Sequence, residues 1–191
     1  MINFVTISAP SGSGKTTLCK ALQLVEPGIE WSISYTTRKR RDIEEDGVDY
    51  HFITLDEFED LILKGHFVEW ENVHGQYYGT ALNSLNDAIK GHKTLLLEMD
   101  VKGSMSIKKL YPEKTFSIFI IPPSIEHLRD RLKKRGTDSE KRIEIRLNRF
   151  KEEMEFQNKF DYVMINENLE LAKIELQNKV KRLKQGERSG T

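Results

Sequence analysis

The chain has 191 residues, which is enough for one domain with a hydrophobic core. Lysine plus arginine and aspartate plus glutamate number 30 each, so the formal net charge is zero. This balance argues against a general nucleic-acid-binding or membrane-surface protein, but it leaves room for a local basic cleft. The single cysteine, Cys19, excludes an intramolecular disulfide framework and fits a reducing compartment.

Apolar runs in the chain are too short to cross a bilayer, and the N-terminus lacks the basic-then-apolar layout of a signal peptide. We therefore expect a cytoplasmic protein that binds neither nucleic acid nor membranes. The histidines have no metal-ligand spacing and no Cys/His cluster suggests zinc. These histidines are His51, His66, His74, His92 and His127.

The first predicted elements are a strand, a glycine-rich turn and a helix. An apolar run over residues 2–7 indicates a buried strand, and residues 15–25 have a helical pattern of apolar positions. Between them, residues 8–17 read Ser-Ala-Pro-Ser-Gly-Ser-Gly-Lys-Thr-Thr. A strand, a tight turn and a helix in this order are typical of a phosphate-binding loop.

The residue types in this turn suit triphosphate binding. Gly12 and Gly14 allow backbone conformations that a Cβ would obstruct, and the N–H groups of such a turn point at an anion. Lys15 would reach the β- and γ-phosphates, and the Thr16 hydroxyl would hold Mg²⁺. Ala9 stands where the full pattern has glycine. The alternative is an ordinary glycine- and serine-rich loop before a helix.

Short alternating segments follow between Trp31 and Tyr78, and they predict a small, partly antiparallel subregion. They lie at residues 32–35, 48–52, 67–70 and 76–78. A phosphate-binding loop occurs in GTPases, ATPases and small-molecule kinases, so by itself it does not identify the class of enzyme. Evidence for a second substrate must come from this subregion.

Further apolar runs at residues 95–97, 116–121 and 162–165 predict strands buried on both faces. Helices alternate with them, so we predict an α/β fold with a parallel sheet flanked by helices. Asp56, Ser124 and Asp138 are candidate N-caps or first-turn acids. The predicted helices span residues 15–25, 55–64, 81–90, 102–110, 124–135, 139–158 and 168–185.

The stretch from 125 to 160 is charge-dense and helical, with Gly136 between two helices. Several of its arginines have helical spacing. We interpret Arg129, Arg142 and Arg149 as solvated helix residues. The polar tail from Lys184 to Thr191 is expected to fray.

Motifs in a fixed order cover nearly the full length, and as a set they closely resemble guanylate kinase. In order they are Ser-Ala-Pro-Ser-Gly-x-Gly-Lys-Thr, Ser-x-Thr-Thr-Arg-x-x-Arg, Gly-x-Asp-Tyr-His-Phe, Phe-x-Glu, Tyr-Tyr-Gly-Thr, Glu-Met-Asp-Val-Lys-Gly and Pro-Pro-Ser. The resemblance implies Mg²⁺-dependent transfer of a phosphoryl group from ATP to GMP, and to dGMP. It also implies one P-loop-type domain over residues 1–191. Its expected parts are a core (1–31, 84–124 and 160–185), a GMP-binding insert (32–83), a mobile lid (125–159) and a polar tail (186–191).

The same resemblance assigns roles to residues that match the family's motifs. The expected ATP-binding residues are Ser11, Gly12, Ser13, Gly14, Lys15, Thr16, Thr17, Arg131, Arg135 and Asn166, with Thr16 on the metal. The expected GMP-binding residues are Ser34, Arg38, Arg41, Tyr50, Glu69, Tyr78, Thr80 and Asp100. The expected catalytic residues are Lys15, Arg41, Arg135 and Arg146.

Residue chemistry supports this assignment independently. Arginine forks match phosphate bidentately and keep their charge. The Glu69 carboxylate can accept hydrogen bonds from N1–H and the 2-amino group of guanine together. Adenine offers no such pair of donors, and a site of this kind can reject the wrong ligand by roughly 10⁴-fold.

Other interpretations stay open. Taken singly, Thr80 and Asp100 could be helix N-caps, Asn166 a turn residue and Glu69 a sheet-face carboxylate. The chain could be a non-catalytic guanylate-kinase-like binding module or a related kinase with another phosphate acceptor, and its oligomeric state is open. Some positions depart from the family pattern: Arg40, Ile43, Glu98 and Lys102 stand where Pro, Gly, Asp and Gln are common.

Overall fold

The computed structural model describes residues 1–73, 75–136 and 139–187, with the side chain of Arg135 left out. Its strands are β1 (Phe4–Ser8), β2 (Ile29–Trp31), β3 (Tyr35–Thr36), β4 (His51–Phe52), β5 (Phe67–Val73), β6 (Gln76–Ala81), β7 (Thr94–Glu98), β8 (Thr115–Ile121) and β9 (Tyr162–Ile165). Its helices are α1 (Lys15–Val25), α2 (Leu55–Leu63), α3 (Leu82–Lys90), α4 (Val101–Leu110), α5 (Ile125–Arg135), α6 (Glu140–Met154), the 3₁₀ helix η1 (Gln157–Lys159) and α7 (Leu169–Lys184). Among these described helices, none has the length and apolar character to cross a bilayer.

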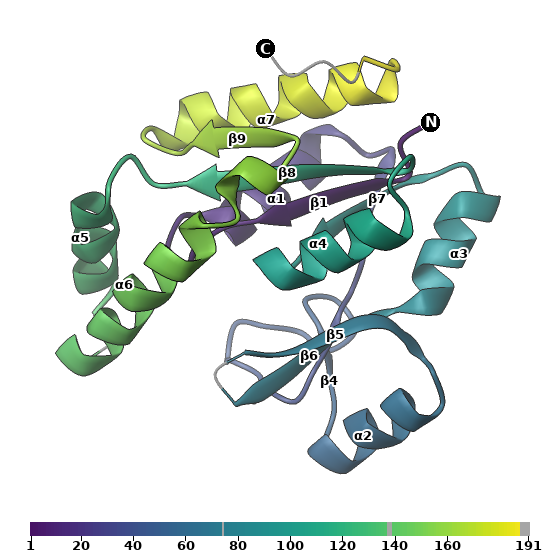
Figure 1. Ribbon diagram of the computed structural model, residues 1–191, viewed down its shortest axis with the longest axis horizontal. Coiled ribbons are helices and arrows are strands. Elements are labelled where there is room, and N and C mark those ends of the chain that lie inside the picture. Colours follow the sequence, from purple (N-terminus) through teal and green to yellow (C-terminus); the bar gives the residue numbers. More distant parts are fainter. Residues whose placement is uncertain (74, 137–138, 188–191) are drawn as a thin grey trace.

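A five-stranded parallel sheet forms the core, in the order β2-β7-β1-β8-β9 (Figure 1). In the central strand, Phe4 lies opposite Leu95 of β7 and Thr115 of β8. Every residue of β1 and β8 is buried, as expected for parallel strands covered on both faces. The predicted α/β fold with a parallel sheet flanked by helices is confirmed.

Alternate side chains of the core sheet pack against different helices. Val5 and Ile7 of β1 belong to a cluster with Leu18 of α1 and Leu176 of α7. Phe4, which directly precedes Val5, packs instead with Leu85 of α3 and other residues of α3 and α4. The sheet is therefore sandwiched between α1 and α7 on one face and α3 and α4 on the other, as Figure 1 shows.

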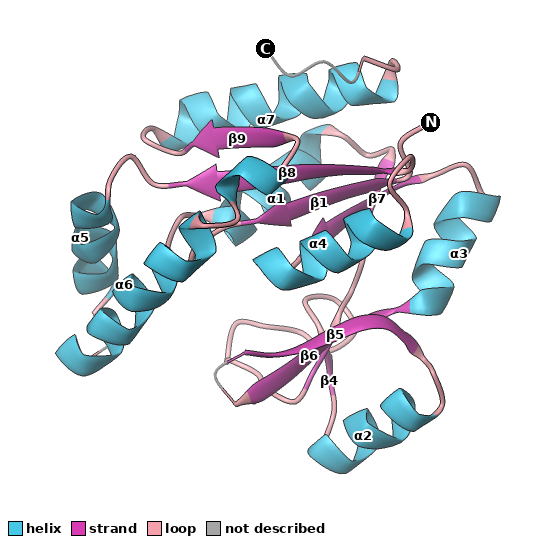
Figure 2. Cartoon of the chain, in the orientation of Figure 1, coloured by secondary structure: helices cyan, strands magenta, loops and turns pink. Residues whose placement is uncertain are grey.

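A second, mixed sheet with the order β4-β3-β6-β5 lies beside the core, together with α2 (Figure 2). Helix α2 begins with a capping box between Thr54 and Glu57. Its buried Phe58 stacks on Phe67 of β5, with ring centroids 4.6 Å apart. Because Gly79 of β6 lies against these rings, a Cβ there would come within 2.9 Å of Phe67 Cδ1.

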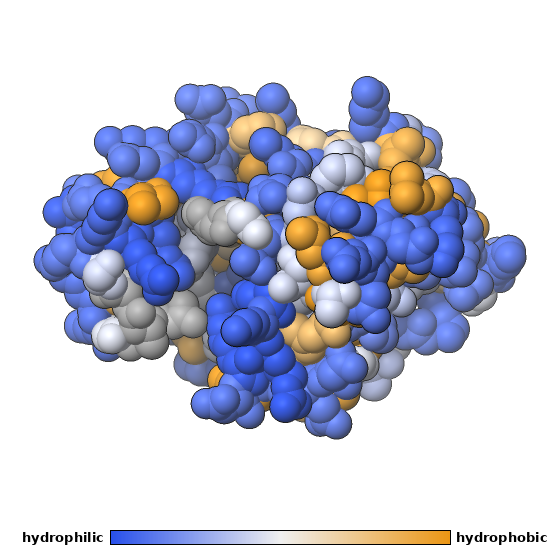
Figure 3. Space-filling model, turned by 90° about the horizontal axis from the view of Figure 1, so that it is seen from below, coloured by the Kyte–Doolittle hydropathy of each residue, from blue (hydrophilic) through white to orange (hydrophobic). Residues whose placement is uncertain are grey.

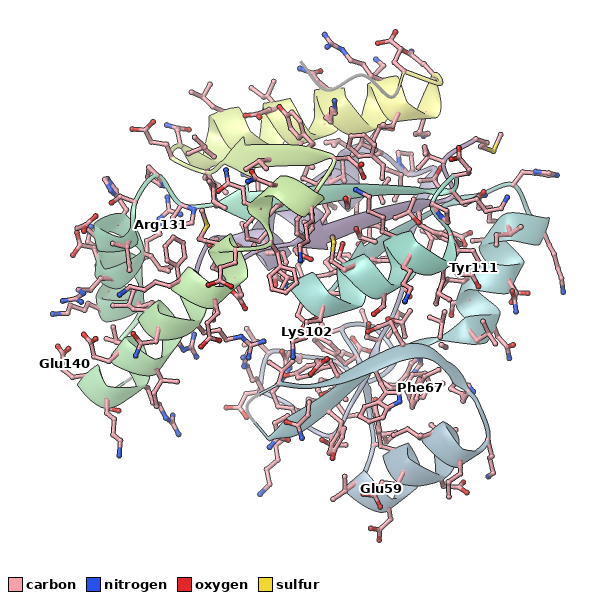
Figure 4. The ribbon with its side chains drawn as sticks, viewed as in Figure 1. Glu59, Phe67, Lys102, Tyr111, Arg131 and Glu140 are labelled. Atoms are coloured by element: carbon pink, nitrogen blue, oxygen red, sulfur yellow. The ribbon has the colours of Figure 1, made fainter. Side chains whose placement is uncertain are left out.

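Ion pairs join the second sheet and its loops to the core. Lys102, near the start of α4, points toward the β5–β6 unit in Figure 4, and its Nζ lies 3.4 Å from Glu71 Oε1. Lys20 of α1 pairs with Asp49, in the loop before β4, at 2.8 Å. Both lysines are more than half exposed.

Helices α5 and α6 form a pair beyond the carboxyl ends of β1 and β8 (Figure 1). They pack on each other through a small apolar cluster of Leu128, Leu132, Ile143 and Leu147. Ser124 caps α5 by accepting a hydrogen bond from the His127 N–H, as predicted.

The structure corrects some predicted boundaries. Residues 29–31 form β2, an edge strand that was not predicted. Of the predicted segment 32–35, only Tyr35 is in a strand, and that strand, β3, continues to Thr36. The helix predicted over 139–158 ends at Met154, before the short η1.

The capping predictions have mixed outcomes. Asp56 lies in the first turn of α2, but the N-cap is Thr54. The predicted cap Asp138 lies outside the described residues, and Ser139 caps α6. Residues 188–191 of the polar tail also fall outside the description.

The face seen from below in Figure 3 is mostly hydrophilic, with hydrophobic residues in small separate patches. Scattered apolar residues of this kind are normal on a protein surface.

We predict that Leu176→Ala lowers the free energy of unfolding by about 2–5 kcal/mol, because it leaves a cavity between α7 and the core sheet. Leu176 is 1% exposed, whereas Leu171 on the same helix is 67% exposed. Urea denaturation should therefore show a change below about 0.5 kcal/mol for the control Leu171→Ala. Equal effects of the two substitutions would contradict this account of the packing.

Candidate functional site

A cleft of about 740 Å³ lies where the core sheet, the second sheet and the α5–α6 pair meet. We call it the central cleft. One end is lined by the turn after β1, the other by residues of the second sheet, and β7, α5 and α6 contribute to its walls. Ligands of open α/β sheets bind at this edge, outside the carboxyl ends of the strands.

The turn after β1 has the geometry of an anion-binding loop. Gly12 and Gly14 have φ angles of 97° and 90°, which other residues rarely adopt. The Ser13 N–H donates to Pro10 O at 3.0 Å and closes the turn. Gly14 directly precedes α1, so the free N–H groups of the helix start face the central cleft.

Lys15 and Thr16 meet Glu98, the last residue of β7. Thr16 Oγ1 donates to Glu98 Oε1 at 2.6 Å, and Lys15 Nζ lies 3.9 Å from the same oxygen. Lys15 Nζ also donates to Met99 O at 3.1 Å. The sequence analysis gave Glu98 little weight because the family often has Asp there.

The Thr16 hydroxyl and Glu98 carboxylate place two hard oxygen donors next to the anion-binding turn. This donor set suits Mg²⁺. In the described part of the chain, no group of three or more His, Cys, Asp and Glu residues could hold a metal by itself. A magnesium ion here would take most of its ligands from phosphates and water.

Two residues expected to bind ATP do not line the central cleft. Ser13 is fully buried and Asn166 is 3% exposed. Asn166 Nδ2 donates to Ser13 O at 2.8 Å, and a Cβ on Gly14 would lie only 2.6 Å from the same nitrogen. Asn166 therefore braces the turn from behind, a role that sequence spacing does not reveal.

At the second-sheet end, Glu44 organises two arginines. Arg38 donates to both carboxylate oxygens at 2.9 Å, and the backbone N–H of Arg41 donates to Oε2 at 2.8 Å. Burial raises the pKa of Glu44, but these hydrogen bonds outweigh burial and hold it below the ordinary value. Glu44 was not among the predicted site residues; its position three residues after Arg41 was the available signal.

Two tyrosines complete this end of the central cleft. The rings of Tyr50 and Tyr78 lie 6.0 Å apart, and the Arg38 guanidinium carbon lies 5.4 Å from the Tyr50 ring centroid. Burial raises the pKa of Tyr50, so its hydroxyl remains a hydrogen-bond donor at neutral pH. The departures Arg40 and Ile43 leave the turn intact, because Ile43 is 92% exposed and the Glu44 N–H donates to Arg41 O at 3.0 Å.

Glu69 of β5 lies opposite Thr80 of β6, which donates to Glu69 Oε1 at 2.5 Å. A Cβ on Gly103 would lie 2.7 Å from Glu69 Oε2, so only glycine lets α4 approach this closely. Burial raises the pKa of Glu69 to about 7, and the charge of Asp100 adds to the effect. Thr80 does not cap α3, whose N-cap is Ala81.

Asp100 caps α4, because its Oδ1 accepts a hydrogen bond from the Gly103 N–H at 2.8 Å. Its other oxygen, Oδ2, is buried and has no hydrogen-bond donor among the described residues. Asp100 is therefore the N-cap of α4, as one of the two interpretations predicted, but its Oδ2 is left for another partner. Ser34 also lines this region of the central cleft.

The arginines of α5 and α6 differ in where they point. Arg131 NH2 donates to Asn166 O at 2.7 Å, which joins α5 to the end of β9 (Figure 4). Arg146 NH1 donates to Ser11 Oγ in the anion-binding turn at 2.7 Å. Both arginines line the central cleft. The Arg135 side chain lies outside the described part of the chain.

The interpretation of Arg149 as a solvated residue is wrong. Its side chain is only 24% exposed, lines the central cleft and donates through Nε to Glu153 Oε1 at 2.8 Å. Arg129 and Arg142 match their predicted exposure, and Arg129 pairs with Glu144. Helical spacing predicted one shared side for Arg142, Arg146 and Arg149; all three lie on α6, but Arg142 is exposed while Arg146 and Arg149 line the central cleft.

Comparison with known proteins assigns the family. The family model described as guanylate kinase matches residues 1–183. The chain belongs to the guanylate kinase family. A guanylate kinase of Prochlorococcus marinus is 45% identical over 177 residues, covering 93% of this chain and 96% of that protein. A guanylate kinase of Carboxydothermus hydrogenoformans is 44% identical over 168 residues, covering 88% and 82% respectively.

The solved structures agree with this family. A crystal structure of guanylate kinase from Anaplasma phagocytophilum has a TM-score of 0.80 and 30% identity. The match covers 95% of this chain and 85% of that one. The guanylate kinase resemblance noted from the motifs is confirmed.

We predict that Glu69→Gln stabilises the free protein at pH 8 by up to roughly 3 kcal/mol. Between the ordinary value of 4.5 and about 7, the folded chain holds a proton that the unfolded chain has lost, so stability falls as pH rises through this window. Urea unfolding should show a gain that shrinks toward pH 5. The exposed Glu59→Gln is the control, and a gain independent of pH would contradict the raised pKa of Glu69.

Proposed function

We propose that this protein transfers the γ-phosphoryl group of ATP to GMP, giving ADP and GDP, and that it accepts dGMP as well. The observation that carries the proposal is the partly buried Glu69 carboxylate, hydrogen-bonded to Thr80, in the same cleft as the anion-binding turn around Lys15. One end of the central cleft suits a triphosphate, and the other suits a guanine base. The guanylate kinase relatives support the same reaction.

Guanine recognition would rest on Glu69. An ionised carboxylate at this position accepts hydrogen bonds from N1–H and the 2-amino group of the base, and Asp100 Oδ2 offers a further acceptor. The hydroxyls of Ser34 and Thr80 would donate toward O6. Base binding would hold the carboxylate ionised, since two donors stabilise its charge.

The GMP phosphate would bind Arg38, Arg41, Tyr50 and Tyr78. Arg41 is the more available arginine, because its side chain is 59% exposed while that of Arg38 is 17% exposed. A phosphate would add to the Glu44 hydrogen bonds of Arg38 or replace them. Residues 32–83 would then serve as the GMP-binding insert.

The triphosphate would bind the turn from Ser11 to Thr17, with Lys15 at the transferring phosphoryl group. The Thr16 hydroxyl would hold Mg²⁺, which supplies positive charge between the phosphates. Arg131, Arg135 and Arg146 would approach from the lid, residues 125–159. Asn166 would act indirectly, by holding the Ser13 carbonyl.

For this reaction the protein would have to align the two substrates and neutralise the negative charge of their phosphates. Phosphoryl transfer passes through a loose transition state whose negative charge lies on the transferring oxygens. Lys15 and the lid arginines would neutralise it from the ATP side, and Arg41 from the GMP side. The attacking phosphate oxygen is already ionised, so no strong general base is needed. Closing the lid would keep water from accepting the phosphoryl group.

Two alternative functions lack support from the described side chains. A non-catalytic binding module has no need for Lys15 and Thr16 aimed into the central cleft. A kinase with another phosphate acceptor has no need for the Thr80–Glu69 pair.

An acceptor screen tests the function. With Mg·ATP, a coupled ADP-release assay should show turnover with GMP and dGMP, and rates lower by roughly 10⁴-fold or more with AMP, CMP and UMP. GMP binding without turnover would favour the binding module. Turnover with a non-guanine acceptor alone would favour the other kinase.

We predict that Glu69→Ala raises the KM for GMP about 100-fold or more while the KM for ATP changes less than about threefold. The substitution removes two hydrogen bonds to a charged acceptor, each worth about 1.5–3 kcal/mol. Steady-state kinetics with each substrate varied in turn measures both constants, and Glu59→Ala serves as the exposed control. A parallel rise in both KM values would count against base recognition by Glu69.

A further inference from the structure

Arg149 joins the lid helix α6 to the end of β7. Its NH2 group lies 3.6 Å from Asp100 Oδ2, and its Nε donates to Glu153 Oε1 at 2.8 Å. Glu153 is one turn further along α6 and 8% exposed, so the guanidinium is fixed from its own helix. Arg149 and Glu153 both line the central cleft.

The oxygen that Arg149 faces is the unsatisfied one. Asp100 Oδ1 already accepts from the Gly103 N–H, whereas the buried Oδ2 has no hydrogen-bond donor among the described residues. At 3.6 Å the guanidinium is an ion-pair partner but too distant for a hydrogen bond. A carboxylate oxygen has two lone-pair sites, so Oδ2 can face both Arg149 and a ligand donor.

A positive charge next to Asp100 is favourable, because a second carboxylate lies close to it. A Cβ at Gly103 would touch the carboxylates of both Glu69 and Asp100, at 2.7 and 3.3 Å, so these two acids are close together. Like charges at such a distance repel, and the charge of Asp100 raises the pKa of Glu69. Arg149 is the cation that the described structure pairs with Asp100.

We infer that Arg149 is a positioning residue for the GMP base: it holds Asp100 from the lid helix and offsets its charge beside Glu69. The inference rests on the proposed function. It makes α6 part of guanine recognition, in addition to the role of Arg146 toward the triphosphate. The contact is made between residues of the chain itself, so we expect it to act on GMP binding whether or not ATP is bound.

The test compares Arg149→Ala with Arg142→Ala, an exposed arginine on the same helix. Titration calorimetry without ATP should show GMP affinity about tenfold weaker for Arg149→Ala and unchanged for Arg142→Ala. In steady-state kinetics the KM for GMP should rise by a similar factor, with the KM for ATP within twofold. Arg149→Lys, which keeps the charge, should recover part of the loss.

A double-mutant cycle shows whether Arg149 acts through Asp100. In an Asp100→Asn background, Arg149→Ala should weaken GMP binding by less than twofold further. Full additivity would overturn the inference. A loss confined to kcat, an equal rise of the ATP KM, or a lower melting temperature with unchanged GMP affinity would also overturn it. If the unmodified protein fails to bind or turn over GMP, the proposed function fails instead.

Discussion

The structure depends on keeping one carboxylate, that of Glu69, largely out of water. The pairing of β5 with β6 puts Thr80 opposite it, and the glycine at 103 lets α4 close over it. Burial disfavours the ionised form of the Glu69 carboxylate. A bound guanine base would stabilise that form again by donating hydrogen bonds to it. In the proposed function, this cost of burial would make the site selective, because a base without those donors would leave the cost uncompensated.

Elsewhere in the central cleft the charged groups have partners within the chain. Glu44 holds Arg38 and Arg41, Glu98 faces Lys15 and Thr16, and Ser11 accepts from Arg146. These contacts restrict the side chains before any ligand binds, and in the proposed function this would lower the entropy lost on binding. Substrate phosphates would share or displace these partners with little rearrangement.

Sequence patterns predicted the core sheet, the helices and the anion-binding turn, because hydrophobic periodicity and glycine spacing are local signals. They missed β2, a three-residue edge strand with one buried position. They also missed the placements set by tertiary packing. Helical spacing placed Arg142, Arg146 and Arg149 on one side of α6. The packing of α5 against α6 leaves Arg142 exposed and brings the other two to the central cleft. Asn166 matched a family position, yet its bond to Ser13 depends on how β9 lies beside the turn.

The ion pairs Lys102–Glu71 and Lys20–Asp49 bear on how the two sheets move relative to each other. Both are solvent-accessible, so each contributes at most about 1 kcal/mol and weakens as ionic strength rises. These two ion pairs would therefore resist a rotation of the second sheet against the core only weakly. Raising the ionic strength would screen both ion pairs and so reduce the resistance that they offer to such a rotation.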